Sequence, residues 1–270
     1  MEFLRDAVNK SGDAMSANRS RGSRRLRVVD ELKFEYTQTA VVPTPPATLH
    51  RNRVIAGRDR DEYADAYRML RSRVMHKLNA GGWTSVGITS TGPGQGKSLT
   101  SANLAVSIAQ KVNNSALLVD FDLRRPSIRS LFDYRGPMGL QHYISKQVPL
   151  EEVLFNPGID RLVVLPGGKP NNRSSELLAS PRVIDLTREV IARYPTRIVI
   201  FDLPPVLATD DALTILPHLD SCLLVVEEGH AKRNEVHRAV ELLGEFNLIG
   251  TVLNKSRDKH SAYSYKTKYY

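Results

Sequence analysis

The chain has 270 residues, a hydrophobic fraction of 41% and a formal net charge of +9 at pH 7, which together allow one large α/β domain or two smaller ones. No apolar run approaches the roughly 18 residues of a membrane-spanning helix, and the N-terminus lacks the apolar run of a secretory signal. The single cysteine, Cys222, lies in an apolar run that predicts a buried position; it excludes a disulfide framework within one chain, and we expect a cytoplasmic protein.

The positive charge is concentrated at the two ends of the chain. Residues 1–60 carry 12 basic and 7 acidic side chains and residues 255–270 carry 5 and 1, whereas residues 61–254 carry 21 of each. Basic ends can bind anionic lipid or nucleic acid, but they are more often solvated tails, and we expect no nucleic-acid partner. We therefore predict a flexible basic arm rich in Pro, Ser and Arg at 1–60, a folded domain at 61–254, and a tail at 255–270.

Within the arm, the prolines around Pro43–Pro46 favour an extended segment and argue against a helix. The domain then opens with a predicted helix over Asp61–Leu78, which Gly81 and Gly82 would end. Its apolar residues recur at helical spacing and would form one face: Tyr67, Leu70, Val74 and Leu78. Its charged residues at spacings of three are Asp65, Arg68 and Arg71, which taken alone indicate a solvated polar face with an ion pair.

The stretch Val86–Ser101 reads V-G-I-T-S-T-G-P-G-Q-G-K-S-L-T-S and predicts a strand, a glycine-rich loop and a helix in that order. This order is the context of a phosphate-binding P-loop, whose backbone N–H groups and helix N-terminus face an anion. Lys97 would reach the β- and γ-phosphates and Ser98 would bind Mg²⁺. The residues expected to contact the nucleotide are Gly92, Gly94, Gln95, Gly96, Lys97, Ser98 and Leu99. Thr91 stands where the strict pattern has glycine, which leaves a glycine-rich helix cap as the alternative.

Two further apolar runs end in carboxylates. Ala116–Leu123 contains Asp120 and Asp122, which strand alternation places on one side, at the sheet edge where ligands of open α/β sheets bind. A helix cap would explain Asp122 but not the pair. Arg197–Pro205 has the form of a Walker B strand, in which Asp202 would hold Mg²⁺ directly or through water.

Strands and helices continue to alternate to the end of the domain. Residues 127–158 predict short amphipathic segments, and helices are expected after Ser175 and around Asn234–Phe246. Further strands are expected at Arg161–Leu165, Cys222–Glu227 and Leu248–Leu253. Alternating β and α segments favour a mostly parallel sheet covered on both faces, that is, an α/β fold of the P-loop NTPase-like three-layer type.

These motifs resemble the bacterial tyrosine kinases (BY-kinases) of capsular and exopolysaccharide biosynthesis, of the cytoplasmic type that works with a separate membrane chain-length regulator. The resemblance covers about residues 61–270 and depends on six features and their order. They are Ala66–Arg71, the loop Pro93–Ser98, Leu117–Pro126, Ser175–Arg182, I-V-I-F-D-L-P-P at 198–205, and the terminal tyrosines Tyr263, Tyr265, Tyr269 and Tyr270. Asp65 stands where the family's oligomerisation helix usually has Glu.

The resemblance implies an ATP- and Mg²⁺-dependent protein-tyrosine kinase that phosphorylates its terminal tyrosine cluster in trans. Lys97 would neutralise phosphate charge, Ser98 and Asp202 would hold Mg²⁺ with Asp120 orienting its ligands, and Asp122 would be the candidate base. A base is needed because a free tyrosine has a pKa near 10. The remaining expectations are a ring-like homo-oligomer through Asp65, Arg68 and Arg71, a membrane co-polymerase partner that brings the kinase to the inner membrane, and a tyrosine phosphatase.

Two other functions remain open. A positioning ATPase of the related deviant P-loop type would hydrolyse ATP, but that type usually has a second lysine near the start of its loop, where this chain has Thr91 and Gly92. A catalytically weak, nucleotide-dependent regulator of a membrane polysaccharide co-polymerase is the third candidate, because of Thr91. The positioning ATPase also leaves the four tyrosines in the last eight residues unexplained.

Overall fold

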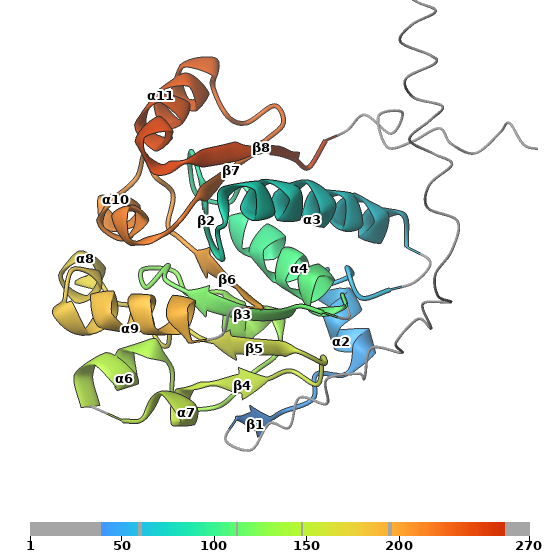
Figure 1. The fold of residues 1–270 in the computed structure, drawn as a ribbon, viewed down its shortest axis with the longest axis vertical. Coiled ribbons are helices and arrows are strands. Elements are labelled where there is room, and N and C mark those ends of the chain that lie inside the picture. Colours follow the sequence, from blue (N-terminus) through green and yellow to red (C-terminus); the bar gives the residue numbers. More distant parts are fainter. Residues whose placement is uncertain (1–38, 59–60, 112, 147, 194–195, 257–270) are drawn as a thin grey trace, which may run out of the picture. The chain divides into compact units, whose positions relative to one another are not determined.

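The structure is a computed structural model, and it describes residues 39–58, 61–111, 113–146, 148–193 and 196–256. Its framework is an eight-stranded sheet with the order β1-β4-β5-β3-β6-β2-β7-β8 (Figure 1). The strands are β1 (Ala40–Val41), β2 (Ser85–Ser90), β3 (Ser115–Asp120), β4 (Phe155–Asn156), β5 (Leu162–Leu165), β6 (Arg197–Asp202), β7 (Cys222–Glu227) and β8 (Leu248–Asn254). Every neighbouring pair is parallel except β4 with β5, which confirms the predicted mostly parallel sheet.

Two hydrophobic cores fill the two faces of this sheet, since alternate residues of each buried strand point to opposite sides. In β3, Ala116 and Leu118 belong to one core and Leu117 and Val119 to the other. Helices cover both faces, so the three-layer α/β architecture is confirmed. The first core packs against α2 (Pro46–Arg51), α3 (Glu62–Gly81), α4 (Lys97–Ala109) and α5 (Ile128–Leu131).

The second core packs against the remaining helices. They are α6 (Leu140–Lys146), α7 (Leu150–Val153), α8 (Ser174–Leu178), α9 (Pro181–Ala192), α10 (Asp211–Ile215) and α11 (Arg233–Leu243). Two short 3₁₀ turns follow α10 and α11, η1 (Leu216–His218) and η2 (Gly244–Phe246). Cys222 lies in this core as predicted, and burial raises the pKa of its thiol to about 12.

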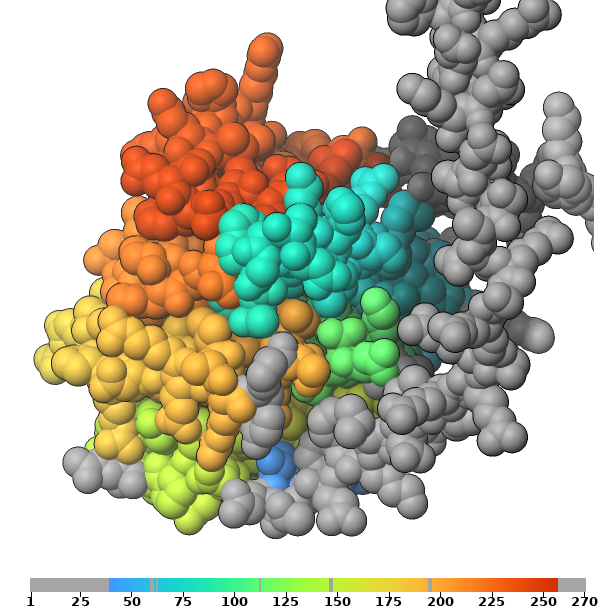
Figure 2. All heavy atoms as spheres, viewed as in Figure 1, coloured from blue at the N-terminus to red at the C-terminus, as the bar shows by residue number. Residues whose placement is uncertain are grey.

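The predicted first helix is confirmed as α3. The Asp61 side chain accepts a hydrogen bond from the backbone N–H of Tyr63, and Gly82 ends the helix with a φ of 66°. One side of α3 packs on α4, and its outer side lies at the surface shown in Figure 2, in teal. No helix in the described part of the chain is long and apolar enough to cross a membrane.

The described part of the predicted arm, residues 39–58, is folded with the domain, so the expectation of a flexible arm is wrong for this segment. The backbone of Val42 donates to Asn156 O beside β4, and Thr44 Oγ1 donates to Phe132 O at 2.7 Å. The expectation of no helix around Pro43–Pro46 is also wrong, because Pro46 is the first residue of α2. Proline is favoured at that position, where the helix leaves the N–H without an intrahelical partner.

The buried amide of Asn103 explains why the segment stays on the domain. Its Oδ1 accepts from the backbone N–H groups of Ile55 and Ala56, and its Nδ2 donates to the carbonyls of Arg53 and Leu99. Asn103 lies on α4, the helix that follows the glycine-rich loop. The N-terminal segment is therefore attached directly to the element that carries the loop.

Candidate active site

The glycine-rich loop connects β2 to α4, as the motif predicts. Gly94 and Gly96 have φ values of 79° and 90°, which favour glycine. At Gly96 a side chain is excluded for a second reason, since a Cβ would lie 2.1 Å from the amide nitrogen of Asn254. The loop is thereby held in a turn that leads into the N-terminus of α4, the geometry that an anion site requires.

Asn254 and Lys255, at the end of β8, brace this loop from the C-terminal side. Asn254 Nδ2 donates to Gln95 O at 2.9 Å, and Lys255 Nζ donates to Gly94 O at 2.8 Å while pairing with Glu227 at 2.9 Å. Motif reasoning missed both residues, because they lie about 160 positions from the loop. The last described strand, and hence the start of the tail, is in contact with the P-loop.

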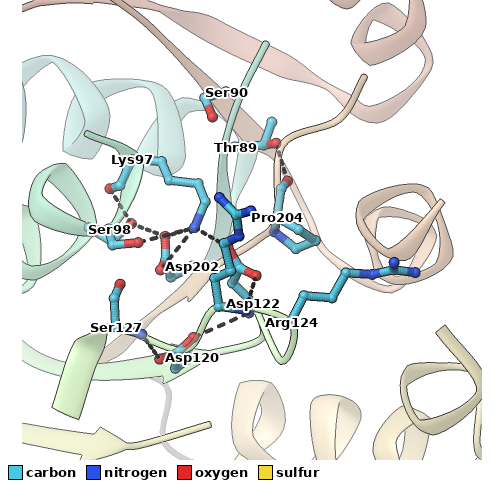
Figure 3. A network of polar contacts seen from close by, with 12 residues as sticks. Thr89, Ser90, Lys97, Ser98, Asp120, Asp122, Arg124, Ser127, Asp202 and Pro204 are labelled. Carbon is cyan, nitrogen blue, oxygen red and sulfur yellow. Dashed lines mark hydrogen bonds and ion pairs between the residues drawn. The ribbon is translucent and has the colours of Figure 1, made fainter. Parts of the chain in front are cut away.

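Lys97 lies at the centre of the site (Figure 3). Its Nζ is 2.8 Å from Asp122 Oδ2, 3.4 Å from Asp202 Oδ2 and 3.1 Å from Ser98 Oγ. Asp202 also accepts a hydrogen bond from Ser101. Motifs from three separate strands thus meet around one ammonium group, as the sequence predicts.

The electrostatic environment of this cluster is acidic. Burial raises the pKa of Asp202 and, together with the neighbouring Asp202 charge, raises the pKa of Asp120 well above its ordinary value. Burial by itself would lower the pKa of Lys97, but the adjacent carboxylates outweigh it and raise that pKa. Lys97 is therefore charged and faces more carboxylates than it can neutralise, so the site favours additional cations.

Asp120 plays a different part from the other two carboxylates. Its Oδ2 accepts the backbone N–H groups of Ser127 and Ile128 at 3.0 and 3.1 Å, and its Oδ1 accepts that of Asp122 at 3.2 Å. The predicted side-by-side pair exists, but only Asp122 reaches Lys97. Asp120 fixes the loop after β3, which sets the position of Asp122.

A second polar cluster, which sequence reasoning missed, fixes the same loop from the opposite side. Arg124 bonds to both carboxylate oxygens of Asp211, at 3.2 and 3.3 Å, and also donates to Ser175. Asp211 is buried and accepts hydrogen bonds from Ser174 and Ser175 as well. In Figure 3 the Arg124 side chain points away from Lys97. The only available signals were the neighbouring family motifs containing Arg124 and Ser175.

A pocket of about 410 Å³ opens above these groups. Its lining comes from the P-loop, from the loop after β3 with Asp122, Arg124, Arg125 and Ser127, and from Pro204 and Pro205. The pocket is continuous with Lys97 and Ser98, and it can hold a polar, anionic ligand against them.

One predicted set, on α3, lies outside the pocket lining. On α3, Arg68 pairs with Asp65 and also donates to Arg58 O, while Arg71 donates to Ser107 O on α4 at 2.8 Å. The four terminal tyrosines lie outside the described residues.

Comparison with known proteins decides the family. The chain is 33% identical to tyrosine-protein kinase YwqD of Bacillus subtilis (strain 168) over 220 residues, which are 80% of this chain and 92% of YwqD. The chain belongs to the bacterial tyrosine kinases of capsular and exopolysaccharide biosynthesis. No family model matches the kinase.

Solved structures agree with this assignment. The kinase resembles the crystal structure of the chimerical protein CapA2B2 with a TM-score of 0.70 and 27% identity, over 81% of this chain and 94% of that one. The septum site-determining protein MinD of Pyrococcus horikoshii OT3, complexed with Mg-ADP, matches at a TM-score of 0.54 and 17% identity over 66% and 75% of the two chains. The MinD likeness shows the P-loop ATPase fold alone, whereas the relatives at higher identity identify this chain as a protein-tyrosine kinase.

Proposed function

We propose that this kinase uses ATP with Mg²⁺ to phosphorylate the tyrosine cluster of its own tail, between subunits. The observation that carries the proposal is the position of Lys97 at the floor of the pocket, between Asp122 and Asp202. Phosphoryl transfer requires mainly charge neutralisation and positioning, and this set supplies both.

The residues fit the nucleotide and the metal. The glycine φ values and the start of α4 form a phosphate cradle, and the pocket has room beside it. Magnesium prefers oxygen ligands, and Ser98 and Asp202, which are hydrogen-bonded to each other, provide a hydroxyl and a carboxylate. Bound there, the metal would neutralise charge on the transferring phosphate.

The proposed roles of the chain's own groups follow from their positions. Lys97 binds the phosphates, Asp122 accepts the phenolic proton, and Asp120 holds the loop that orients Asp122. The tail begins at Lys255, whose side chain contacts the P-loop, so the first residue of the tail lies beside the nucleotide site of its own subunit. Transfer to a neighbouring subunit's tail is part of the proposal and follows from the family resemblance.

The proposed biological role is regulation of exopolysaccharide or capsule polymerisation and export, through a membrane co-polymerase and opposed by a tyrosine phosphatase. YwqD and CapA2B2 support the family context, and the partner itself is part of the proposal. The kinase would reach the inner membrane through that partner.

Incubation of the full chain with labelled ATP and Mg²⁺, followed by phosphotyrosine detection, tests the proposal. Label on Tyr263, Tyr265, Tyr269 or Tyr270 supports it. Free phosphate alone would select the positioning ATPase, and neither product would select the catalytically weak regulator. Mixing a kinase-dead chain with an active, tail-less one separates transfer in trans from transfer in cis.

A further inference from the structure

Not all of the basic side chains that line the pocket form ion pairs with carboxylates. Lys97 pairs with Asp122 and Asp202, and Arg124 pairs with Asp211. Arg125 also lines the pocket, is exposed, and has no side-chain hydrogen bond or ion pair within the described ranges. Arg125 is thus a cation beside the proposed transfer site that is not paired with a described carboxylate.

The backbone that carries Arg125 is held firmly. Its N–H donates to both the carboxylate and the carbonyl of Asp122, at 3.0 and 3.1 Å. On one side Arg124 is anchored to Asp211, and on the other Ser127 donates to Asp120. A free guanidinium therefore projects from a fixed loop, and little backbone entropy is lost when it binds a ligand in the pocket.

The P-loop does not provide a second cation. Positioning ATPases usually have a lysine near the start of this loop, where the present chain has the neutral residues Thr91 and Gly92. The Thr91 hydroxyl instead accepts a hydrogen bond from the Gln95 amide at 2.6 Å, and both side chains are buried. Among the described residues, Lys97 is the basic side chain that pairs with Asp122 and Asp202. Charge on the equatorial oxygens of the transferring phosphoryl group needs further stabilisation, which in related chemistry an arginine provides.

We propose that Arg125 is the second cation of the transfer site and contacts the phosphoryl group in flight, while Arg124 and Asp211 hold its loop. This rests on the proposed phosphoryl transfer. The bond from the γ-phosphorus to the β,γ-bridging oxygen breaks and its electron pair leaves with ADP. The tyrosine oxygen forms the new bond to phosphorus, and its proton passes to Asp122. The planar fork of the Arg125 guanidinium suits two equatorial oxygens.

The test compares full-length wild type with Arg125→Ala, Arg125→Lys and a control, Arg135→Ala, whose side chain is 88% exposed and lies outside the pocket lining. Arg125→Ala is expected to lower kcat about 100- to 1,000-fold, below the full effect of arginine fingers, with the KM for ATP changed less than about threefold. Arg125→Lys should recover part of the rate, because it restores charge without the fork.

A binding measurement provides the second readout. Wild type should bind Mg·ADP more tightly when aluminium fluoride is added as a planar phosphoryl mimic, and Arg125→Ala should lose this gain while binding Mg·ADP alone normally. The inference would be overturned if Arg125→Ala still bound Mg·ADP more tightly in the presence of aluminium fluoride. It would also be overturned if Arg125→Ala lost affinity for Mg·ADP alone by the same factor as it lost kcat. Wild type that labels no tyrosine but shows the fluoride gain, lost in Arg125→Ala, would count against the proposed function and not against Arg125.

Discussion

Among single residues, Lys97 has the central role in the proposed phosphoryl transfer, and its replacement is the direct test. Lys97→Met keeps an unbranched apolar stem but removes the ammonium that Asp122 and Asp202 share. We expect autophosphorylation to fall by at least about 100-fold, as when a transition-state donor is lost, with the far-UV circular dichroism unchanged. Lys111→Met, at an exposed position, is the matched control. Normal labelling of Lys97→Met would show that the site is misassigned.

Single residues also mark how far sequence reasoning reaches. The gathering of Lys97, Ser98, Asp122 and Asp202 in one place could be predicted, because a P-loop and two carboxylate-ending strands are local patterns whose geometry is fixed by a parallel sheet, while their roles stay predictions. The contacts that hold the loop after β3 and the P-loop in place could not be predicted. The Arg124–Asp211 pair and the Asn254–Gln95 contact join residues 87 and 159 positions apart, and only the fold brings them together.

The same distinction holds at the scale of elements. Strands β3, β6 and β7 follow from continuous apolar runs with clear ends, and β2 and β8 follow from shorter apolar segments. Strands β1 and β4 are two residues each, too short for a period-2 pattern, and exist because β4 pairs with both β1 and β5. The sequence pattern does not predict α2, because proline breaks a helix in its interior although it is also a good first helical residue.

Two elements, α8 and α10, are joined to the loop after β3 through Asp211. Burial by itself would raise the pKa of Asp211, but hydrogen bonds from Arg124 and two serine hydroxyls hold it below its ordinary value. A carboxyl whose pKa is lowered by folding stabilises the fold above the unfolded-state pKa of about 4, and this contribution is lost as the pH falls through the lower, folded value.

Asp211→Asn is therefore expected to lower the free energy of unfolding by roughly 1–3 kcal/mol at pH 7, as when a charged hydrogen bond is lost. The difference from wild type should shrink as the pH falls below about 4. Urea unfolding across this range measures it, with the exposed Asp185→Asn on α9 as the control. A difference that is independent of pH would mean that the carboxylate charge contributes nothing.

Assembly is the question at the scale of the whole molecule, and α3 is its candidate surface. We expect the unphosphorylated Lys97→Met chain to form a large species in analytical ultracentrifugation, and Arg68→Ala/Arg71→Ala to prevent it. A heterologous contact that closes on itself produces such a ring. Arg71 donates to Ser107 O and Arg68 donates to Arg58 O within their own subunit, so both single variants are needed, each with its unfolding temperature, to separate lost assembly from a loosened α3. Arg73→Ala, exposed on the same helix, is the control.

The prediction would be contradicted by a wild-type protein that stays monomeric when it is both unphosphorylated and bound to its membrane partner. Thermal unfolding of each variant completes the comparison. If Arg68→Ala and wild type unfold at the same temperature, loss of the large species reports the contact between subunits and not the stability of one subunit.

We expect the charge of the tail to couple assembly to catalysis. Residues 255–270 carry 5 basic and 1 acidic side chain, so the unmodified tail is suited to a neighbour's site with three aspartates. Each phosphotyrosine adds roughly −1.5 to −2 at pH 7, so four of them add about −6 to −8 and reverse the sign of the tail. The modified tail is then repelled by carboxylates wherever Mg²⁺ does not mask them. We therefore expect phosphorylation to release the tail and to loosen both the ring and its hold on the membrane partner.

Three forms of the protein test this switch: phosphorylated wild type, phosphatase-treated wild type, and a chain with Tyr263, Tyr265, Tyr269 and Tyr270 all changed to Phe. The Phe chain should stay assembled in ATP and Mg²⁺, because it has no terminal acceptor hydroxyl, and the phosphorylated form should sediment as a monomer at moderate salt. Raising the salt should narrow the difference, since screening weakens charge repulsion between exposed groups. If the phosphorylated and dephosphorylated forms assemble equally, the switch is ruled out, although the kinase activity is not. Polymer synthesis would then depend on the kinase in some way other than cycling between assembled and released states.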